Sequence, residues 1–309
     1  MTPVVSIILP TFNRLQYLPA TVTSVLSQTF TQWELIIADD GSDAQTQAYL
    51  QSLADPRISV IWLAHTGRPA VVSNIALQQA RGEFIAFIDS DDLWLPNKLH
   101  RQIESLRRHP RRRWSYTGFA LIDAAGSPIA PRAGSRHWPC PSGWILEALL
   151  HEITVIAQPS VVVARELLEN LGAFDEQLIM CYDDELWFRL AAHSEIDGLE
   201  EPLTLVRRHQ HHSGSDVIAW QDRGKVFNKV LRAHHDPRLA GILRQRRAEM
   251  SAGLARSQAA ARLRLRALRT LTASAVHSWR YPHCWLLALG AIARSFAPQA
   301  LRTLVRRYR

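Results

Sequence analysis

The strongest constraint on the fold is an alternation of short apolar runs with helical patterns across residues 4–88. Four runs of β-branched or aromatic residues, each bounded by turn residues, are typical of buried strands: Val4–Leu9, Glu34–Ala38, Ile58–Leu63 and Phe84–Ile88. Between them, Leu15–Gln28 and Arg68–Arg81 carry apolar residues at helical spacing. Strands that alternate with helices predict an α/β fold with a parallel sheet covered by helices on both faces.

Acidic residues follow two of these strands. Asp39 and Asp40 come after the second run, and Asp89, Asp91 and Asp92 come after the fourth. Sheets of this kind bind ligands at the carboxyl ends of their strands. Clustered carboxylates repel one another unless a cation neutralises them, and a hard divalent ion would do so while leaving positions for phosphate oxygens. The alternatives are a solvated N-capping turn at residues 89–91 and an Asx-type turn before Gly41.

Five segments then appear in a fixed order: Val5-Ser-Ile-Ile-Leu-Pro-Thr-Phe-Asn-Arg14, Ser27-Gln-Thr-Phe30, Glu34-Leu-Ile-Ile-Ala-Asp-Asp-Gly-Ser42, Gly82-Glu-Phe-Ile-Ala-Phe-Ile-Asp-Ser-Asp-Asp92 and Gly172-Ala-Phe-Asp-Glu176. On these segments, residues 3–215 resemble the family 2 inverting glycosyltransferases. The resemblance implies a nucleotide-sugar-dependent enzyme with the GT-A fold, a Rossmann-like, mostly parallel sheet flanked by helices.

The resemblance also implies donor-binding roles for individual residues. The loop with Pro10, Thr11 and Asn13 should run along the nucleotide. Asp40, together with Asp39, should accept a hydrogen bond from the base or ribose. Asp89 should lie near the ribose. Asp91 should hold the Mg²⁺ or Mn²⁺ that bridges the two phosphates, with Asp92 nearby, where the ion would stabilise the charge of the departing diphosphate.

A second constellation, Cys181-Tyr-Asp-Asp-Glu-Leu-Trp-Phe-Arg-Leu190, resembles the family's general-base segment. Alignment on its Leu-Trp-Phe-Arg run places the base at Asp183, where a carboxylate would remove the proton of the acceptor hydroxyl. Asp184 is the rival candidate, and helix N-capping is the structural alternative. Tyr182 stands where the family commonly has Glu, which leaves the geometry of the acceptor open.

A third segment, Arg207-Arg-His-Gln-His-His-Ser-Gly-Ser215, resembles one that closes over the diphosphate. By position, Arg208 and His209 would contact phosphate or metal; a solvated loop or a fortuitous metal-binding tract is the alternative.

Ser73-Asn74 stands where relatives commonly have Arg-Asn, so the identity of the donor stays open. Trp138 and Trp144 are interpreted as core residues in preference to sugar-stacking ones.

Charge divides the chain into two unlike parts. Residues 1–222 hold 17 Lys and Arg against 26 Asp and Glu, whereas residues 223–309 hold 19 against 2. From about residue 223 the chain is predicted to be helical, and an apolar stripe runs along residues 243–272 with most arginines off it. This basic region could bind an anionic membrane surface, pack its stripe on the catalytic domain, or bind nucleic acid, which the sparse aromatic residues disfavour.

We therefore predict a GT-A catalytic domain at residues 1–222, with a nucleotide-sugar half (1–113) and an acceptor half (114–222), and a basic helical region at 223–309. The expected function is metal-dependent, inverting, hexosyltransferase-like transfer from a nucleotide diphosphate-sugar, with a UDP-sugar favoured, to a saccharide or lipid-linked hydroxyl in cell-surface polysaccharide or glycolipid synthesis. A catalytically silent, membrane-associated nucleotide-sugar scaffold is the alternative. Three dispersed cysteines and a longest apolar run of residues 284–293 indicate a cytoplasmic protein, peripheral at most at the inner face of the membrane.

Overall fold

The computed structural model describes residues 2–130, 138–208, 216–233 and 236–296, and the chain forms two compact units. The first, here called the sheet unit, comprises residues 1–177 and 182–212. The second, the helical unit, comprises residues 178–181 and 213–309. The predicted boundary between residues 222 and 223 falls inside helix α8 (Asp216–Ala233), so a truncation that respects the helices must end before α8.

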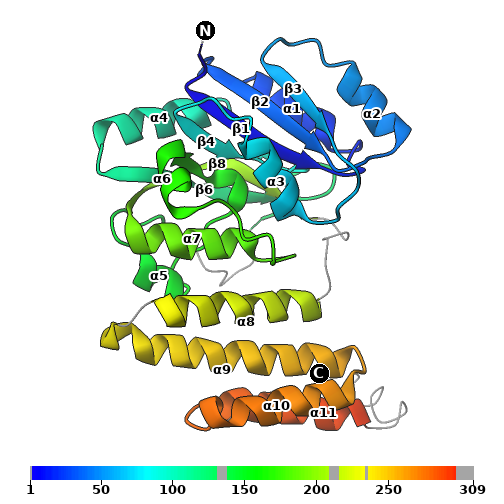
Figure 1. The fold of residues 1–309 in the computed structure, drawn as a ribbon, viewed down its shortest axis with the longest axis vertical. Coiled ribbons are helices and arrows are strands. Elements are labelled where there is room, and N and C mark those ends of the chain that lie inside the picture. Colours follow the sequence, from blue (N-terminus) through cyan, green and yellow to red (C-terminus); the bar gives the residue numbers. More distant parts are fainter. Residues whose placement is uncertain (1, 131–137, 209–215, 234–235, 297–309) are drawn as a thin grey trace. The chain divides into compact units, whose positions relative to one another are not determined.

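The sheet unit is built on one eight-stranded sheet in the order β3-β2-β1-β4-β7-β6-β8-β5 (Figure 1). The four predicted strands are present and mutually parallel: β1 (Val5–Thr11), β2 (Trp33–Asp39), β3 (Ile58–Trp62) and β4 (Phe84–Phe87). Next to β4, the short strand β7 (Val162–Ala164) runs antiparallel and joins the second half of the sheet. The predicted α/β architecture is therefore confirmed.

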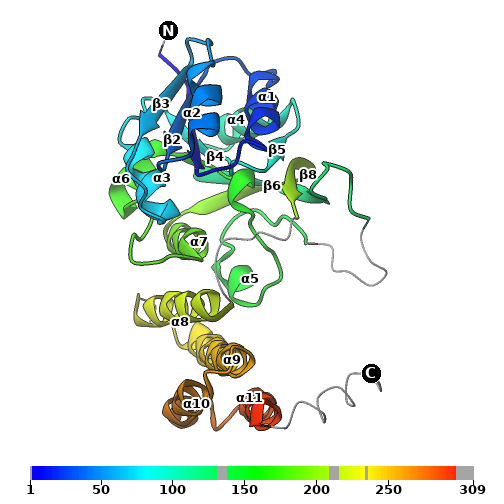
Figure 2. The same ribbon diagram turned by 90° about the vertical axis from the view of Figure 1, so that its right-hand side faces the viewer.

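Helices cover both faces of this sheet (Figures 1 and 2). Alternate residues of β1 point to opposite faces, so Ile8 enters one buried cluster while Ile7 and Leu9 enter the other. The first cluster includes α3 (Pro69–Leu77) and α7 (Tyr182–His193); the second includes α1 (Leu18–Leu26), α2 (Ala44–Gln51) and α4 (Lys98–Arg108). The short elements of the acceptor half are α5 (Leu146–Leu150), a 3₁₀ turn at Gln158–Ser160 and α6 (Arg165–Leu171).

Two long strands lie beyond the stretch of alternating strand and helix patterns at residues 4–88. Strands β6 (Arg112–Ile122) and β8 (Glu195–Arg207) pair in parallel, and β5 (Leu93–Trp94) pairs antiparallel with β8. The register of β6 against β8 shifts around Gly118, opposite Pro202. These irregularities interrupt the period-two pattern by which a strand is recognised in a sequence, which explains why both strands were missed.

The helical unit consists of α8, α9 (Pro237–Ala260), α10 (Arg264–Ser278) and α11 (Pro282–Phe296). The apolar stripe predicted over residues 243–272 is not on one helix, because the chain turns at residues 261–263, where Arg262 has a φ of 62°. On α9, Leu243 and Met250 are buried, and four alanines of α9 pack against α10 and α11. Within the helical unit, the α9 part of the stripe is therefore a packing surface.

Close approach of α8 to α9 depends on a glycine. A Cβ added to Gly253 would lie 2.4 Å from the ring of Trp220, so only glycine lets the indole of α8 rest on α9. None of the helices in the described part of the chain is both long and apolar enough to cross a bilayer.

A buried lysine in α4 gives a prediction about stability. Lys98 is fully buried, and its Nζ lies 4.1 Å from the centroid of the Trp94 ring with no hydrogen-bond partner among the described residues. Burial lowers the pKa of Lys98 well below its usual value. Since the unfolded chain then binds more protons, this lysine destabilises the fold at low pH, and the cost fades as pH rises toward the ordinary lysine pKa of about 10.4.

We expect Lys98→Met to raise the free energy of unfolding by at least about 1 kcal/mol near pH 6, with a smaller gain near pH 10. Thermal melts of both proteins across this range measure the difference, with Lys229→Met in the helical unit as an exposed control. A Tm gain of equal size at both pH values would show that Lys98 is not held neutral in the folded state.

Candidate active site

The candidate site lies where the parallel strands end. Strands β1 and β2 are in register so that Thr11 pairs with Asp39 at their last residues. Four loops continue from the strand ends at residues 12–17, 40–43, 63–68 and 88–92. The parallel pairing brings these loops to the same edge of the sheet, as expected from the positions of the acidic residues.

Two polar atoms at the ends of β1 and β2 are buried without a partner. The hydroxyl of Thr11 and Oδ1 of Asp39 belong to residues that are 4% and 1% exposed, and neither atom makes a hydrogen bond within the described structure. The other carboxylate oxygen of Asp39 accepts from the backbone N–H of Ser42 at 3.1 Å. Buried polar atoms normally have partners, so this pair marks a position suited to a ligand or an ordered water.

Asp40 holds the loop that follows β3. One of its carboxylate oxygens accepts from the backbone N–H of Thr66 at 2.7 Å, and the other accepts from that of Gly67 at 2.9 Å. The ring of His65 stacks on Phe12 with centroids 4.0 Å apart. Two loops predicted to hold the nucleotide are thus bound to a third loop, which the sequence analysis did not single out.

Asn13 joins the loops that follow β1 and β2. It has a φ of 51°, its N–H donates to the hydroxyl of Ser42 at 2.9 Å, and its side-chain oxygen accepts from the N–H of Asp43 at 2.7 Å. Asn tolerates this left-handed conformation better than most residues, which is a local reason for its presence here. Pro10 lies within β1 itself. The nucleotide-binding roles predicted for these residues stay predictions.

A glycine sets the spacing between two of these loops and supplies a second prediction. Gly41 has a φ of +77°, and a Cβ there would lie 2.8 Å from the backbone nitrogen of His65. We expect Gly41→Ala to lower the free energy of unfolding by about 1–2 kcal/mol from the left-handed backbone alone. Displacement of the His65 loop should weaken nucleotide binding as well.

Gly224→Ala in α8 is a matched control because an added Cβ there meets no atom within 4 Å. This control should be neutral or stabilising, as is usual for alanine in a helix. Urea denaturation and nucleotide titration of both variants measure the two effects. Equal stability of Gly41→Ala and the natural protein would remove the steric argument.

Carboxylates from two distant parts of the sequence meet beyond the end of β4. Loss of hydration is the largest of the effects that raise the pKa of Asp89 to about 8; the charges of Asp91 and Asp183 act in the same direction, and Arg14 opposes them. Asp183 lies in the first turn of α7, one residue after the helix begins at Tyr182. The structure thus brings together the predicted metal ligand, the predicted ribose contact and the predicted base.

Tyr182 lies at the same site. Burial raises its pKa well above the ordinary value for tyrosine, and the charges of Asp89 and Asp183 add to this effect. Its ring packs edge-on against Phe174 with centroids 5.3 Å apart. The residue that stands in place of the family's usual Glu is therefore a neutral phenol beside the carboxylates.

Asp92 has a structural role next to this site. It is 4% exposed, and its carboxylate accepts from the backbone N–H of Arg207 at 2.7 Å. The Arg207 guanidinium in turn donates to the carbonyl oxygen of Asp91 at 2.7 Å, and also to those of Asp123 and Ala124. Asp92 and Arg207 thereby fix the end of β8 against the loop that carries Asp91.

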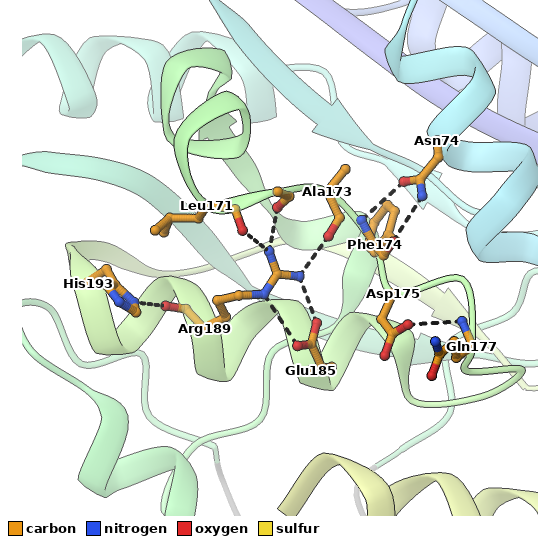
Figure 3. Close-up of polar contacts among 10 residues, drawn as sticks. Asn74, Leu171, Ala173, Phe174, Asp175, Gln177, Glu185, Arg189 and His193 are labelled. Atoms are coloured by element: carbon orange, nitrogen blue, oxygen red, sulfur yellow. Dashed lines mark hydrogen bonds and ion pairs between the residues drawn. The ribbon is translucent and has the colours of Figure 1, made fainter. Parts of the chain in front are cut away.

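Helix α7 is anchored by its own arginine (Figure 3). Arg189 forms an ion pair with Glu185 at 2.7 Å and donates to the carbonyl oxygens of Leu171, Gly172 and Ala173. Asn74 of α3 binds Phe174, which comes directly after these three residues. The side-chain oxygen of Asn74 accepts from the N–H of Phe174 at 3.1 Å, and its Nδ2 donates to the Phe174 carbonyl oxygen at 2.9 Å. The segment at residues 171–174 is thus held by Arg189 of α7 and by Asn74 of α3. These contacts keep α7, and therefore Asp183, in place.

The segment after β8 is described only at its start. Arg208 is exposed, and its backbone N–H donates to the carbonyl oxygen of Ile122 at 2.7 Å. His209 lies outside the described residues, so its predicted contact with phosphate or metal stays a prediction.

Trp144 is 64% exposed, which contradicts its assignment to the core; the short bridge between Gly143 and Ile196 leaves the adjacent indole at the surface. Trp138 is half-buried.

Sequence reasoning missed Phe12 and His65, and one signal could have indicated them. Phe12 follows directly on β1, and His65 comes three residues after the end of β3, so both lie in loops at the same end of the parallel strands as the acidic residues. Their stacking depends on the bend at Gly41 and on the bonds of Asp40 to the neighbouring loop, and neither feature is visible in a hydropathy pattern.

Comparison with curated proteins gives consistent relatives. A sequence model of glycosyl transferase family 2 matches residues 6–113. The chain is 43% identical over 244 residues to the putative colanic acid biosynthesis glycosyl transferase WcaA of Escherichia coli strain K12, covering 76% of this chain and 82% of that protein. It is 40% identical over 129 residues to the putative teichuronic acid biosynthesis glycosyltransferase TuaG of Bacillus subtilis strain 168.

A further relative, 40% identical over 131 residues, is the UDP-Glc:alpha-D-GlcNAc-diphosphoundecaprenol beta-1,3-glucosyltransferase WfgD of Escherichia coli. The alignments with TuaG and WfgD cover 41% of this chain and 51% of each relative, so the chain spans about half the length of these two proteins. Among solved structures, S. aureus TarS 1-349 in complex with UDP-GlcNAc aligns with a TM-score of 0.61 at 20% identity, covering 95% of this chain and 81% of that chain. This last similarity is one of fold.

Proposed function

Since this chain belongs to glycosyl transferase family 2, we propose that it transfers a sugar from a nucleotide diphosphate-sugar to a hydroxyl group in the synthesis of a cell-surface polysaccharide or glycolipid. The observation that carries the proposal is the convergence of Asp89 and Asp91 with Asp183 at the carboxyl end of the sheet. Repelling carboxylates in a poorly hydrated position are costly for stability, and such arrangements concentrate at functional sites.

The donor would lie along the strand ends, with its nucleoside near the unpartnered atoms of Thr11 and Asp39. Asp40 and Asn13 would keep the surrounding loops in place, and the exposed side of the Phe12–His65 stack offers an aromatic surface to a base or ribose. A UDP-sugar is the preferred donor because WfgD is named for UDP-Glc and TarS is known in complex with UDP-GlcNAc.

Asp91, together with Asp89, would hold a Mg²⁺ or Mn²⁺ ion. Within the described ranges, no group of three or more His, Cys, Asp or Glu side chains is arranged to hold a metal. Mg²⁺ in nucleotide enzymes commonly takes one or two carboxylates and completes its shell with phosphate oxygens and water, so the pair fits this kind of site. When bound, the ion supplies stabilisation of the charge on the departing nucleoside diphosphate.

Asp183 would act as the general base. It would accept the proton of the acceptor hydroxyl as the new bond forms on the face of the sugar opposite the leaving group, and this single displacement inverts the anomeric carbon. Tyr182 is unsuited to the base role since its raised pKa keeps it protonated, but its hydroxyl can donate a hydrogen bond. The ion pair of Arg189 with Glu185 keeps the first turn of α7 oriented toward the donor.

The acceptor would be a saccharide or a lipid-linked saccharide. WfgD is named for a diphosphoundecaprenol-linked acceptor, which gives the lipid-linked class its support. The exposed indole of Trp144, in the acceptor half, presents a face on which a sugar ring could stack. A lipid-linked acceptor would place the enzyme at the inner face of the membrane as a peripheral protein.

A silent nucleotide-sugar scaffold is the second candidate function. Two departures from the family pattern favour it. Tyr182 stands in place of the usual Glu, and Ser73 stands where relatives commonly have Arg. Ser73 is fully buried, and its hydroxyl has no partner among the described residues. Both functions predict nucleotide binding, so binding alone does not separate them; turnover does.

Calorimetric titration with UDP-, GDP- and TDP-sugars, each with Mn²⁺ and again with EDTA, tests the donor site. We expect one nucleotide class to bind in the presence of Mn²⁺ and to lose most of its affinity with EDTA. Thr11→Val, which removes the buried hydroxyl and keeps the shape of the side chain, should weaken binding of the same nucleotide. Failure of every nucleotide to bind would contradict both candidate functions.

A further inference from the structure

Helices α10 and α11 carry apolar residues both on the faces that pack against α9, here called the inner faces, and on uncovered surface, here called the outer faces. The inner faces, with Ala267 and Leu271 on α10 and Ala288 and Ile292 on α11, are buried against α9. The outer faces also carry large apolar side chains: Leu265, Val276 and Trp279 are 74%, 75% and 64% exposed, and Leu286, Leu289 and Phe296 are 56%, 40% and 53% exposed. Large exposed apolar surface of this kind marks an interaction site.

The spacing of these residues places each set on one face of its own helix. At 100° per residue, Leu265, Val276 and Trp279 fall within about 60° of one another around α10, and Leu286, Leu289 and Phe296 fall within about 80° around α11. The two helices lie side by side against α9 within the helical unit (Figure 2). An ordinary surface helix has one apolar stripe, which it buries. Helix α10 has a second stripe on its opposite side, and on α11 the uncovered apolar residues extend the buried stripe outward.

The charge around this surface has a single sign. The sequence contains no Asp or Glu after Glu249, whereas Arg262, Arg266, Arg269 and Arg280 are exposed on or beside α10. Two arginines also lie over the aromatic residues of the outer faces, with Arg280 5.0 Å from the ring centroid of Trp279 and Arg264 4.7 Å from that of Phe296. Aromatic rings with arginine heads beside them suit a boundary that is apolar on one side and anionic on the other.

From this combination we propose that the outer faces of α10 and α11 bind the surface of an anionic lipid bilayer. The apolar side chains would enter the acyl boundary and the arginines would contact lipid phosphates. A second copy of the chain is disfavoured as the occupant because two surfaces of the same positive charge would repel. Nucleic acid is disfavoured because leucine and valine, rather than aromatic platforms, dominate the surface.

This surface differs from the one expected from the sequence. The stripe considered for membrane binding lies partly on α9 and is buried there, whereas α10 and α11 carry the uncovered residues. The proposal does not depend on sugar transfer, since vesicle binding is measured without a donor or an acceptor. Vesicle binding can therefore fail while sugar transfer is observed, and sugar transfer can fail while vesicle binding is observed.

The test is cosedimentation of the full chain with phosphatidylcholine vesicles, with and without about one-third phosphatidylglycerol. Trp279→Glu and Leu286→Glu should each reduce binding to the anionic vesicles by at least about tenfold, because a charge at the acyl boundary opposes insertion. Leu26→Glu at the end of α1 is the control: it is an exposed leucine, 39% exposed, that lies in the sheet unit and outside the candidate site. It should bind the vesicles as the natural chain does.

Arg266→Ala combined with Arg269→Ala keeps the apolar surface and removes two positive charges, so it should lose preference for anionic over neutral vesicles. Retention of full binding by both glutamate variants would overturn the proposal. So would a change of oligomeric state in those variants with unchanged vesicle binding, since the surface would then be a protein interface. Displacement of the chain from vesicles by an oligonucleotide, but not by salt at the same ionic strength, would favour nucleic acid instead.

Discussion

Asp183→Asn is expected to lower the turnover of glycosyl transfer by roughly 10²- to 10⁴-fold, which is the usual contribution of a general base. The amide keeps the shape of the side chain but cannot accept the proton of the acceptor hydroxyl. The donor should still bind, because the strand-end loops that would hold the nucleotide are built without Asp183. Initial rates at saturating donor, together with a separate titration of nucleotide, measure the two effects.

Asp184→Asn is the control for this assignment. Asp184 is adjacent, lies in the same first turn of α7 and carries the same charge, so both variants change the electrostatics of the helix terminus alike. If Asp184→Asn has the larger effect on turnover, the base has been assigned one residue too early. Loss of donor binding in Asp183→Asn would instead indicate that this carboxylate belongs to the nucleotide site.

Asp91→Asn is expected to remove the metal-dependent part of nucleotide binding. Replacement of a residue that only supports a ligand commonly costs about 10- to 100-fold in metal affinity, so loss of a direct carboxylate ligand should cost at least as much. Titration of UDP with and without Mn²⁺ measures the change. In the variant, the two affinities should be nearly equal.

Asp92→Asn provides the comparison from the next position in the sequence. Its carboxylate accepts from the backbone of Arg207, a task that an amide oxygen can also perform, so the response to Mn²⁺ should be retained. An unchanged response to Mn²⁺ in Asp91→Asn, with a loss in Asp92→Asn, would transfer the ligand role to Asp92 and contradict the site as assigned.

The sequence predicted the first half of the sheet because its strands are short and regular, and because β1, β2 and β4 are almost entirely buried. It also placed the acidic residues at the sheet edge, where Asp39 and Asp89 are found. Strands β6 and β8 could not be predicted in the same way, because shifts of register around Gly118 break the alternation of apolar and polar residues. The pattern that reveals a strand is lost wherever a bulge is inserted.

Long-range polar contacts were similarly inaccessible. Asn74 was noted only for the residue that precedes it, yet its side chain holds a loop 100 residues away in the sequence. In the basic region, the apolar stripe was detected but the turn at Arg262 was not, so the stripe was extended over two helices. Which apolar residues are buried and which are uncovered depends on how four helices pack, and periodicity alone does not determine this.

The most direct test of the transfer reaction is release of nucleoside diphosphate from a panel of UDP-, GDP- and TDP-sugars by the natural chain with Mn²⁺. We predict that one donor is consumed, slowly by hydrolysis in the absence of an acceptor, and that EDTA abolishes the reaction. Tight binding of a nucleotide with no turnover of any donor, with or without an extract of saccharide and lipid-linked acceptors, would contradict the account and identify the chain as a binding protein.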